Sequence, residues 1–431
     1  MLDKSTRKLF LAALTPALLI LILLQGAVVR SQGSPTQSPT MAATLMAYTG
    51  PFDGTLLFGI PLALTGSLSN EGNLSREGYE LWKEVYNNAG GIMVGGKRYQ
   101  IETKYYDDES SAQKSATLAE KLIKEDKVNF LLGPYGTSAV LQVSTVAEKH
   151  QIPMIEGGGV AESIFSQGYK YTFLVASPAK SYLLGVIDMA LAQTPAPTTV
   201  TILSADDPFS VEVTDSAKTY AQNKGLKLVY YQKYPSNSTD LRAPLTEAKG
   251  KNADLFLNSG HFAESVAIMQ QAKELDFLAK AYAFSVGPSL PNFQTTLKAN
   301  ANYVVDGTQW TADLNYNGVD LFKSPQAYHQ MYIARWGHGP PYQSASATVS
   351  GIAFVQALQA AETIDPHAVR DQIAKLDIMT FYGQVKFDSR GVNIYKPMVV
   401  EQWQNGQKVT IWPPDVANGK PLWPAPAWDK R

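Results

Sequence analysis

Short apolar runs that end at glycine-containing turns recur along most of the chain. The run Leu56–Leu64 is nearly continuous, which is typical of a parallel strand buried on both faces. Between such runs the apolar positions recur at helical spacing, as at Tyr79, Trp82, Val85 and Tyr86. The pattern therefore predicts repeated strand–turn–helix units.

These units fall into two sets of similar size. The first set has predicted strands at residues 56–64, 99–105, 129–132, 152–155 and 171–176, and helices at 75–88, 111–125 and 137–150. The second set has strands at 199–203, 227–231, 255–257 and 281–286, and helices at 181–193, 210–223, 241–249 and 263–275. Further helices at 324–336, 344–363 and 366–375 precede β-rich segments at 383–388, 398–403 and 408–412. Two α/β lobes follow, each built on a parallel sheet.

Two neighbouring units in the first set carry the most informative turns. One strand ends at Gly133-Pro134-Tyr135-Gly136, and the next ends at Glu156-Gly157-Gly158-Gly159. Adjacent units of this kind place parallel strands side by side, with both turns at the carboxyl edge where open α/β sheets bind ligands. Thr137 and Ser138 would then lie at a helix N-terminus, which favours a small anion such as a carboxylate. We predict half of a binding site here. The alternative is two tight turns and a capping threonine.

Composition excludes several classes of protein. The chain has 431 residues, of which 45% are hydrophobic and 17% charged, as in a folded soluble protein. A formal net charge of -1 gives no indication of nucleic acid or an acidic partner. The chain has no cysteine, which excludes disulfides, thiol catalysis and cysteine metal sites.

The N-terminus predicts export. Lys4, Arg7 and Lys8 precede an apolar run from Leu9 to Leu24, as in a signal peptide. No small-x-small cleavage site follows, and Ala27 stands where a lipoprotein would carry its lipidated cysteine. Residues 1–30 are therefore a cleaved signal peptide or an uncleaved signal anchor, without lipid. Residues 31–54 form a predicted linker, and the remainder lies in the periplasm or at the cell surface.

Motifs for cofactors, metals and catalysis are weak. Residues 91–98 approach a Walker A loop, but Arg98 replaces its Ser or Thr and the segment runs from a helix into a strand. The five histidines lack metal-ligand spacing, and no nucleophile elbow is present. Asp107-Asp108-Glu109 and Asp206-Asp207 are explained more simply as helix caps than as metal ligands. We predict no cofactor, no metal and no enzyme, although Glu71 and Glu156 leave an exported acid–base enzyme as one alternative.

Four segments carry a resemblance to a known family through their order and spacing. They are Pro61–Gly66, Tyr105–Ser111, Leu132–Tyr135 and Gly383–Asp388. The chain resembles the type I periplasmic binding proteins, specifically the solute-binding proteins of branched-chain amino acid and amide ABC transporters. The resemblance implies two Rossmann-like lobes that close like a Venus flytrap on a small-molecule ligand, which is then delivered to a membrane permease.

The resemblance also implies three hinge crossings, which we place near Ser177, Gly307 and Tyr382. The first lobe would comprise residues 55–176 and 308–381, and the second lobe residues 177–307 and 382–424. A membrane-anchored sensor ectodomain of the same fold is the alternative function, and neighbouring genes would distinguish the two.

Ligand contacts follow from the resemblance position by position. Thr137, with Ser138 beside it, matches the hydroxyl that binds a ligand carboxylate, and Gly158 matches a backbone contact. Val160 replaces a common threonine, and Pro288-Ser289 stands where amino-acid binders place a glutamate for the ammonium group. The full set of predicted contacts is Glu71, Tyr135, Thr137, Ser138, Glu156, Gly157, Gly158, Val160, Phe209, His261 and Ser289.

The missing glutamate makes a plain branched-chain amino acid doubtful. Glu71 or Glu156 could take over the ammonium group, or the ligand could lack one. Amides, other amino acids, and aromatic or short-chain carboxylates all stay open.

Overall fold

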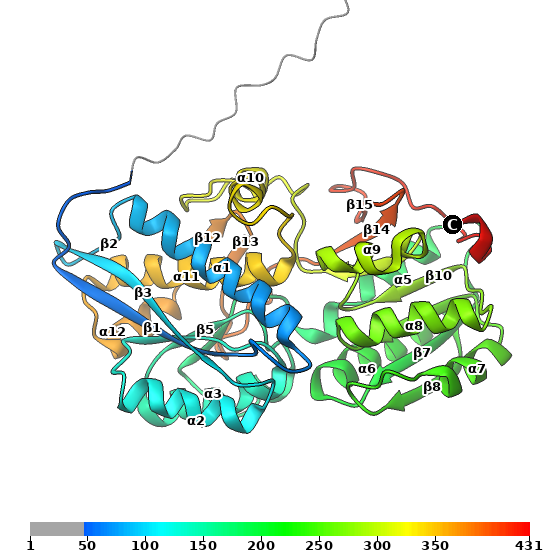
Figure 1. Ribbon diagram of the computed structural model, residues 1–431, viewed down its shortest axis with the longest axis horizontal. Coiled ribbons are helices and arrows are strands. Elements are labelled where there is room, and N and C mark those ends of the chain that lie inside the picture. The colour runs from blue at the N-terminus through cyan, green and yellow to red at the C-terminus, as the bar shows by residue number, and fades with distance from the viewer. Residues whose placement is uncertain (1–46) are drawn as a thin grey trace, which may run out of the picture. The chain divides into compact units, whose positions relative to one another are not determined.

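The computed structural model describes residues 47–431. The predicted export segment and residues 31–46 of the predicted linker lie outside the described residues. Within residues 47–431, no helix is both long and apolar enough to cross a membrane. Two lobes make up this part of the chain, each with its own sheet (Figure 1). The predicted α/β class with parallel-dominated sheets is confirmed.

The sheet of the first lobe has six strands in the order β2-β3-β1-β4-β5-β6. All neighbours are parallel except β2 and β3, which form an antiparallel hairpin. The strands are β1 (Gly54–Leu62), β2 (Ile92–Val94), β3 (Lys97–Asp107), β4 (Phe130–Leu132), β5 (Met154–Glu156) and β6 (Thr172–Leu174). Strand β2 was not predicted, since its three residues are too few to show a period.

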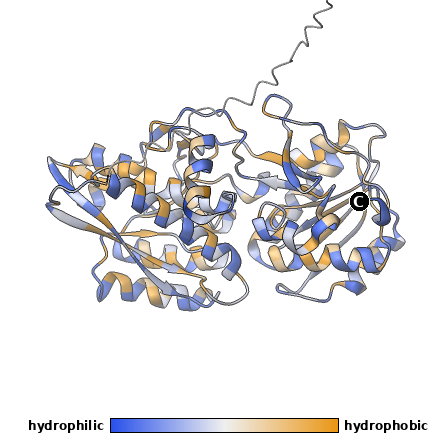
Figure 2. Cartoon of the chain, turned by 45° about the horizontal axis from the view of Figure 1, so that its top comes forward, coloured by the Kyte–Doolittle hydropathy of each residue, from blue (hydrophilic) through white to orange (hydrophobic). Residues whose placement is uncertain are grey.

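Helices cover both faces of this sheet. They are α1 (Ser69–Asn88), α2 (Ala112–Lys124), α3 (Thr137–His150), α4 (Glu162–Phe165), α10 (Pro325–Trp336), α11 (Tyr342–Ala361) and α12 (Pro366–Ile373). Figure 2 shows hydrophobic and hydrophilic residues alternating along the helices, as expected where one face of a helix covers a sheet. Helix α1 begins at Ser69, six residues before its predicted start. The predicted start is too late because Ser69–Gly72 has the composition of a turn.

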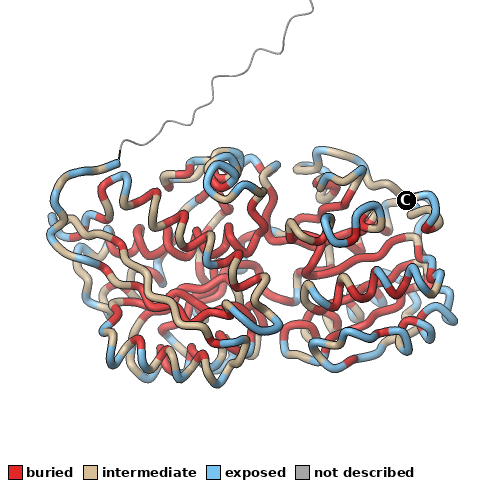
Figure 3. The backbone as a smooth tube through the Cα atoms, in the orientation of Figure 1, coloured by how far each residue is buried: buried red, intermediate tan, exposed pale blue. Residues whose placement is uncertain are grey.

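Helix α11 is buried along most of its length and packs against α1 (Figure 3). The Ser344 hydroxyl donates to the Leu74 carbonyl at 2.7 Å, and the Thr348 hydroxyl donates to the Gly78 carbonyl at 2.8 Å. A Cβ at Gly78 would lie 2.1 Å from the Ser344 carbonyl oxygen, so the two helices approach closely only because glycine is present. Helix α1 is therefore held firmly, and its N-terminal end faces the second lobe.

The sheet of the second lobe has seven strands in the order β15-β14-β11-β10-β9-β7-β8. They are β7 (Thr199–Ala205), β8 (Lys227–Tyr234), β9 (Leu255–Ser259), β10 (Ala281–Phe284), β11 (Val305–Thr308), β14 (Val399–Gln404) and β15 (Gln407–Trp412). Strand β14 pairs antiparallel with β11 and β15, and the other neighbours are parallel. The helices are α5 (Leu184–Leu191), α6 (Pro208–Asn223), α7 (Arg242–Gly250), α8 (Phe262–Glu274) and α9 (Pro291–Leu297). Neither α9 nor β11 was among the predicted elements.

Three chain segments connect the lobes, and side chains tie them together. The Ser177 N–H donates to Gln309 Oε1 at 2.9 Å, and Gln309 Nε2 donates back to the Ser177 carbonyl at 2.9 Å. The Ser177 hydroxyl donates to the Lys396 carbonyl at 2.8 Å. The hinge is thus a hydrogen-bonded cluster with one member from each crossing.

The lobe boundaries stay a prediction, and strand pairing favours a later third crossing than the one placed near Tyr382. Strands β12 (Asp377–Thr380) and β13 (Gly383–Lys386) pair with each other, and the backbone at Val392 bridges to Leu174 of β6. Strand β14 is the next element and belongs to the second sheet. We therefore propose residues 393–398 as the third crossing.

Candidate functional site

The two glycine-containing turns of the first lobe lie side by side. The Gly136 N–H donates to the Gly158 carbonyl at 3.1 Å. Gly136 has a φ of 97°, which favours glycine, and a Cβ at Gly158 would lie 2.8 Å from the Pro134 carbonyl oxygen. The sequence therefore permits a close approach of two bare backbones at the carboxyl edge of the sheet.

Glu156 holds the second turn from beneath. Its Oε2 accepts the N–H groups of Gly158 and Gly159, each at 2.7 Å. Burial raises the pKa of Glu156 to about 8, although both hydrogen bonds act in the opposite direction. The carboxyl group thus fixes the shape of the turn from within the first lobe.

Helix α3 begins at the first turn and presents polar groups to the second lobe. Its N-cap residue is Gly136, which has no side chain to accept the first N–H groups. Thr137 is 4% exposed, and its Oγ1 has no hydrogen-bond partner within residues 47–431. The first N–H groups of a helix lack acceptors in the helix itself, so this end is electropositive.

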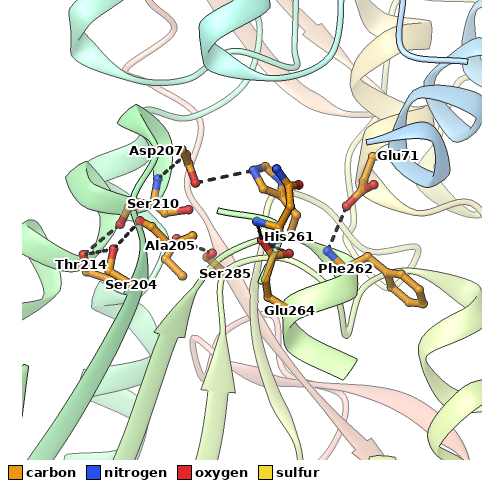
Figure 4. A network of polar contacts seen from close by, with 12 residues as sticks. Glu71, Ser204, Ala205, Asp207, Ser210, Thr214, His261, Phe262, Glu264 and Ser285 are labelled. Atoms are coloured by element: carbon orange, nitrogen blue, oxygen red, sulfur yellow. Dashed lines mark hydrogen bonds and ion pairs between the residues drawn. The ribbon is translucent and has the colours of Figure 1, made fainter. Parts of the chain in front are cut away.

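The facing wall comes from the second lobe (Figure 4). Asp207 caps helix α6, because its Oδ1 accepts the Ser210 N–H at 3.0 Å. His261 precedes helix α8, and its ring lies 6.2 Å from the Tyr135 ring across the cleft and 5.9 Å from the Phe209 ring. The aromatic side chains and Asp207 therefore lie opposite the start of helix α3.

A cavity of about 140 Å³ separates these two walls. Its lining is Ser67, Leu68, Asp108, Ser110, Ala112, Tyr135, Gly136, Thr137, Ser138 and Ala139 from the first lobe, and Asp207, Ser236, Asn237 and His261 from the second. A recess of about 10 Å³ shares part of that lining. It is lined by Tyr135, Gly136, Thr137, Gly157, Gly158, Val160, Tyr182, Phe209, His261 and Tyr342. We call the larger space the main chamber and the smaller one the recess.

Eight of the eleven predicted contact residues line one of these two spaces: Tyr135, Thr137, Ser138, Gly157, Gly158, Val160, Phe209 and His261. Their role as ligand contacts stays a prediction, which the geometry supports. Glu71, Glu156 and Ser289 line neither space.

Glu71 joins the lobes instead. It is fully buried, and its Oε1 accepts the Phe262 N–H of the second lobe at 3.1 Å (Figure 4). Burial raises the pKa of Glu71, while the nearby His261 and this N–H oppose the rise. Ser289 is buried in the second lobe, where its carbonyl accepts from Lys408 Nζ at 3.1 Å.

Sequence reasoning missed several lining residues. Asp207 follows strand β7 at the same edge as the predicted contacts, so its position could have indicated a ligand contact. A helix-capping role explained the same residue equally well. Tyr182 and Tyr342 come from a hinge turn and from the start of α11, and no sequence signal pointed to them. Among residues 47–431, no cluster of three His, Asp or Glu side chains could hold a metal ion.

Two α/β lobes that meet at a cavity, with a three-segment hinge beside it, define a protein of the two-lobed binding class. The chain belongs to the periplasmic binding protein family, because the sequence model of that family matches residues 55–408. The predicted family is therefore confirmed.

Known proteins agree with this assignment. The chain is 29% identical over 378 residues to the Leu/Ile/Val-binding protein homolog 8 of Brucella abortus (strain 2308), which covers 84% of this chain and 92% of that protein. The branched-chain amino acid transporter substrate-binding protein LivJ from Streptococcus pneumoniae, solved in complex with isoleucine, superimposes with a TM-score of 0.72 at 20% identity. That match covers 83% of this chain and 100% of LivJ.

A solute-binding protein of an ABC transporter from R. palustris, solved in complex with benzoate, has a TM-score of 0.71 at 16% identity. That match covers 87% of this chain and 97% of the other. At such identities the two structures establish the shared fold. The first is named as a substrate-binding protein of a branched-chain amino acid transporter, and the second as a solute-binding protein of an ABC transporter.

Proposed function

We propose that this chain is an exported solute receptor that captures a small amino acid, amide or carboxylate between its lobes and delivers it to an ABC transporter permease. One observation carries the proposal: the main chamber lies between the lobes, and the start of helix α3 with the unpartnered Thr137 hydroxyl faces it. A buried hydroxyl without a partner is costly unless a ligand satisfies it.

The chemistry of this end suits an anionic group. The first N–H groups of helix α3 and the partial positive charge of its dipole attract a carboxylate. The Thr137 hydroxyl adds one further donor. A carboxylate bound here would accept hydrogen bonds from the first N–H groups of helix α3 and from the Thr137 hydroxyl.

Capture would be coupled to closure of the lobes. Glu71 and Asn70, at the start of α1, reach Phe262 and Asn292 of the second lobe. A ligand that touches both walls stabilises the closed form and shifts the open–closed equilibrium toward it.

Delivery to a permease rests on the family and on the names of the structural neighbours. A sensor ectodomain of the same fold is the second candidate, favoured by the apolar run at residues 9–24 without a clear cleavage site. Permease and ATPase genes beside this gene would support transport, whereas a kinase gene would support sensing.

Binding is tested by thermal unfolding of residues 47–431 with a library of amino acids, amides and organic acids. A solute bound only by the folded state raises the unfolding midpoint. We expect Thr137→Val to weaken that solute by about tenfold, the equivalent of one lost hydrogen bond at about 1.4 kcal/mol.

Thr145→Val is the matched control, because Thr145 lies on the exposed side of the same helix. No midpoint shift with any compound of a broad library would count against a receptor function. Equal weakening by both substitutions would instead remove Thr137 from the site.

A further inference from the structure

The lining of the cleft carries acidic side chains with little to balance them. Asp108 and Asp207 both line the main chamber, and His261 is the single side chain with a basic group among the residues that line the two spaces. Neither lysine nor arginine is part of either lining. A solute that is only an anion would therefore meet negative charge on its far side.

The two aspartates differ in how their oxygens are used. Asp108 Oδ1 accepts the Ser110 N–H at 2.8 Å, and its Oδ2 accepts the Ser115 hydroxyl at 2.7 Å. Asp207 Oδ1 accepts the Ser210 N–H at 3.0 Å. Asp207 Oδ2 is buried and has no hydrogen-bond partner within the described residues. Asp207 thus retains one unused carboxylate oxygen in the wall of the chamber.

His261 does not satisfy that oxygen. Its Nε2 lies 3.9 Å from Asp207 Oδ2, which is an ion-pair distance when the imidazole is protonated but is beyond hydrogen-bond distance (Figure 4). Glu71 and Glu156 also have one oxygen without a partner among the described residues, but neither residue lines the main chamber or the recess. Asp207 is therefore the acid that can meet a donor carried by the solute.

We propose that Asp207 selects a solute with a cationic nitrogen, so that the receptor binds a small dipolar molecule. The inference rests on the proposed function and names the chemical class for the same site. The anionic end of the solute lies at the start of helix α3, and its cationic end lies at Asp207 on the opposite wall. The acid thus comes from the turn after β7, whereas Ser289 in the turn after β10 brings none.

This assignment distinguishes solutes that Thr137 alone would accept. An amino acid and its des-amino carboxylic acid share the group that helix α3 binds. The des-amino acid would leave Asp207 Oδ2 unpaired in the closed cleft. A hydrogen bond to a charged group contributes about 1.5–3 kcal/mol, which corresponds to an affinity difference of about 10- to 100-fold.

The test uses matched pairs of probes: glutamine with glutaramic acid, leucine with 4-methylpentanoic acid, and phenylalanine with 3-phenylpropanoic acid. Calorimetry gives the affinity ratio within each pair for residues 47–431. We expect the amino acid of a binding pair to bind about 10- to 100-fold more tightly. Asp207→Asn should reduce this ratio to about threefold or less, because the amino acid loses its partner and the des-amino acid no longer meets the carboxylate.

Folding is controlled within the same design. Asparagine and serine both cap helices about as well as aspartate, so Asp207→Asn and Asp207→Ser should keep the unfolding midpoint of the solute-free protein. Asp206→Asn makes the same charge change at the neighbouring residue, which is exposed and pairs with Lys233. A loss of selectivity in both Asp207 variants but not in Asp206→Asn would support the proposal.

Three outcomes would overturn it. A des-amino acid that binds as tightly as its amino acid would remove the role of Asp207 and leave the receptor function intact. An unchanged ratio in Asp207→Asn would assign the cationic group to another residue. If none of the six probes binds but a library compound without a cationic nitrogen does, the selection by Asp207 is wrong while the receptor function stands.

Discussion

Two buried glutamates flank the cleft, and they differ in which lobe they serve. Glu156 and Glu71 are both fully buried, and each has one oxygen that accepts backbone N–H groups and one without a partner among residues 47–431. The acceptor oxygen of Glu156 binds the turn of its own lobe, whereas that of Glu71 binds the N–H of Phe262 in the other lobe. Glu156 therefore shapes one wall, and Glu71 connects the two walls.

An acid near the cleft does not necessarily line it. Glu71 was predicted as a ligand contact from its place in the family resemblance and Glu156 as an acid near the turns, either of which could take over an ammonium group. Neither lines the main chamber or the recess. Asp207, by contrast, lines the chamber and has one oxygen without a hydrogen-bond partner among the described residues. From the sequence, this residue was interpreted only as a helix cap. Each of the three acids has one oxygen without a hydrogen-bond partner among the described residues, so its place in the lining of the main chamber is what distinguishes Asp207 from the two glutamates.

The largest expected effect concerns the contribution of Glu156 to stability. The pKa of Glu156 is raised from 4.5 to about 8 in the folded protein, so between these values the folded state holds a proton that the unfolded state has lost. This contribution to the free energy of unfolding is present below pH 4.5 and is lost as pH rises toward 8. The slope from one such group reaches about 1.4 kcal/mol per pH unit.

Glu156→Gln removes the titration and retains an oxygen for the two N–H groups. Relative to the parent, the free energy of unfolding of the variant should rise by several kcal/mol as the pH increases from 5 to 8. Urea unfolding at four pH values measures it. Glu148→Gln is the control, because Glu148 also accepts two backbone N–H groups but is only partly buried. A difference that does not vary with pH would contradict the assignment.

The next effect concerns closure rather than stability. Glu71→Ala removes the acceptor for the Phe262 N–H, and we expect the affinity for a bound solute to fall by about tenfold, because hydrogen bonds to charged groups contribute about 1.5–3 kcal/mol. A smaller closed fraction lowers the apparent affinity in proportion. Calorimetry gives the affinity, and small-angle scattering of the solute-free variant should show a larger radius of gyration.

Glu84→Ala is the matched control for this prediction. Glu84 lies on the same helix and pairs with Arg335 within the first lobe, so its loss should leave closure unchanged. Glu71→Gln, which retains an acceptor, should lie between the parent and the alanine variant. Equal affinities in all of these proteins would show that Glu71 does not contribute to closure.

The sequence predicted the fold well and the site unevenly, for physical reasons. Buried parallel strands such as β1 are continuous apolar runs, and the turns after β4 and β5 require glycine. Both features can therefore be recognised in the sequence. Thr137 could be found because its place at a helix start follows from the turn before it. Tyr182 and Tyr342 could not, because only the packing of hinge and helix brings them to the recess.

A second contact between the lobes is expected to have the smallest effect on affinity. Asn292 Nδ2 of α9 donates to Asn70 Oδ1 at 2.9 Å, and the reverse hydrogen bond is 3.4 Å long. Both side chains are neutral and partly buried, so we expect Asn292→Ala to lower the affinity by about threefold, in line with a neutral hydrogen bond of about 0.5–1.5 kcal/mol. Calorimetry on the same solute measures this effect against that of Glu71→Ala.

The double variant Glu71→Ala with Asn292→Ala then shows how the lobes close. Asn70 and Glu71 are neighbours on α1 but contact different helices of the second lobe, α9 and α8. If the lobes move as two rigid bodies, the two losses act on one equilibrium and their free energies add. A double variant no weaker than Glu71→Ala alone would mean that the Asn70–Asn292 contact forms only after Glu71 has joined the lobes. A larger effect of Asn292→Ala than of Glu71→Ala would reverse the ranking and make α9 the principal contact of the closed form.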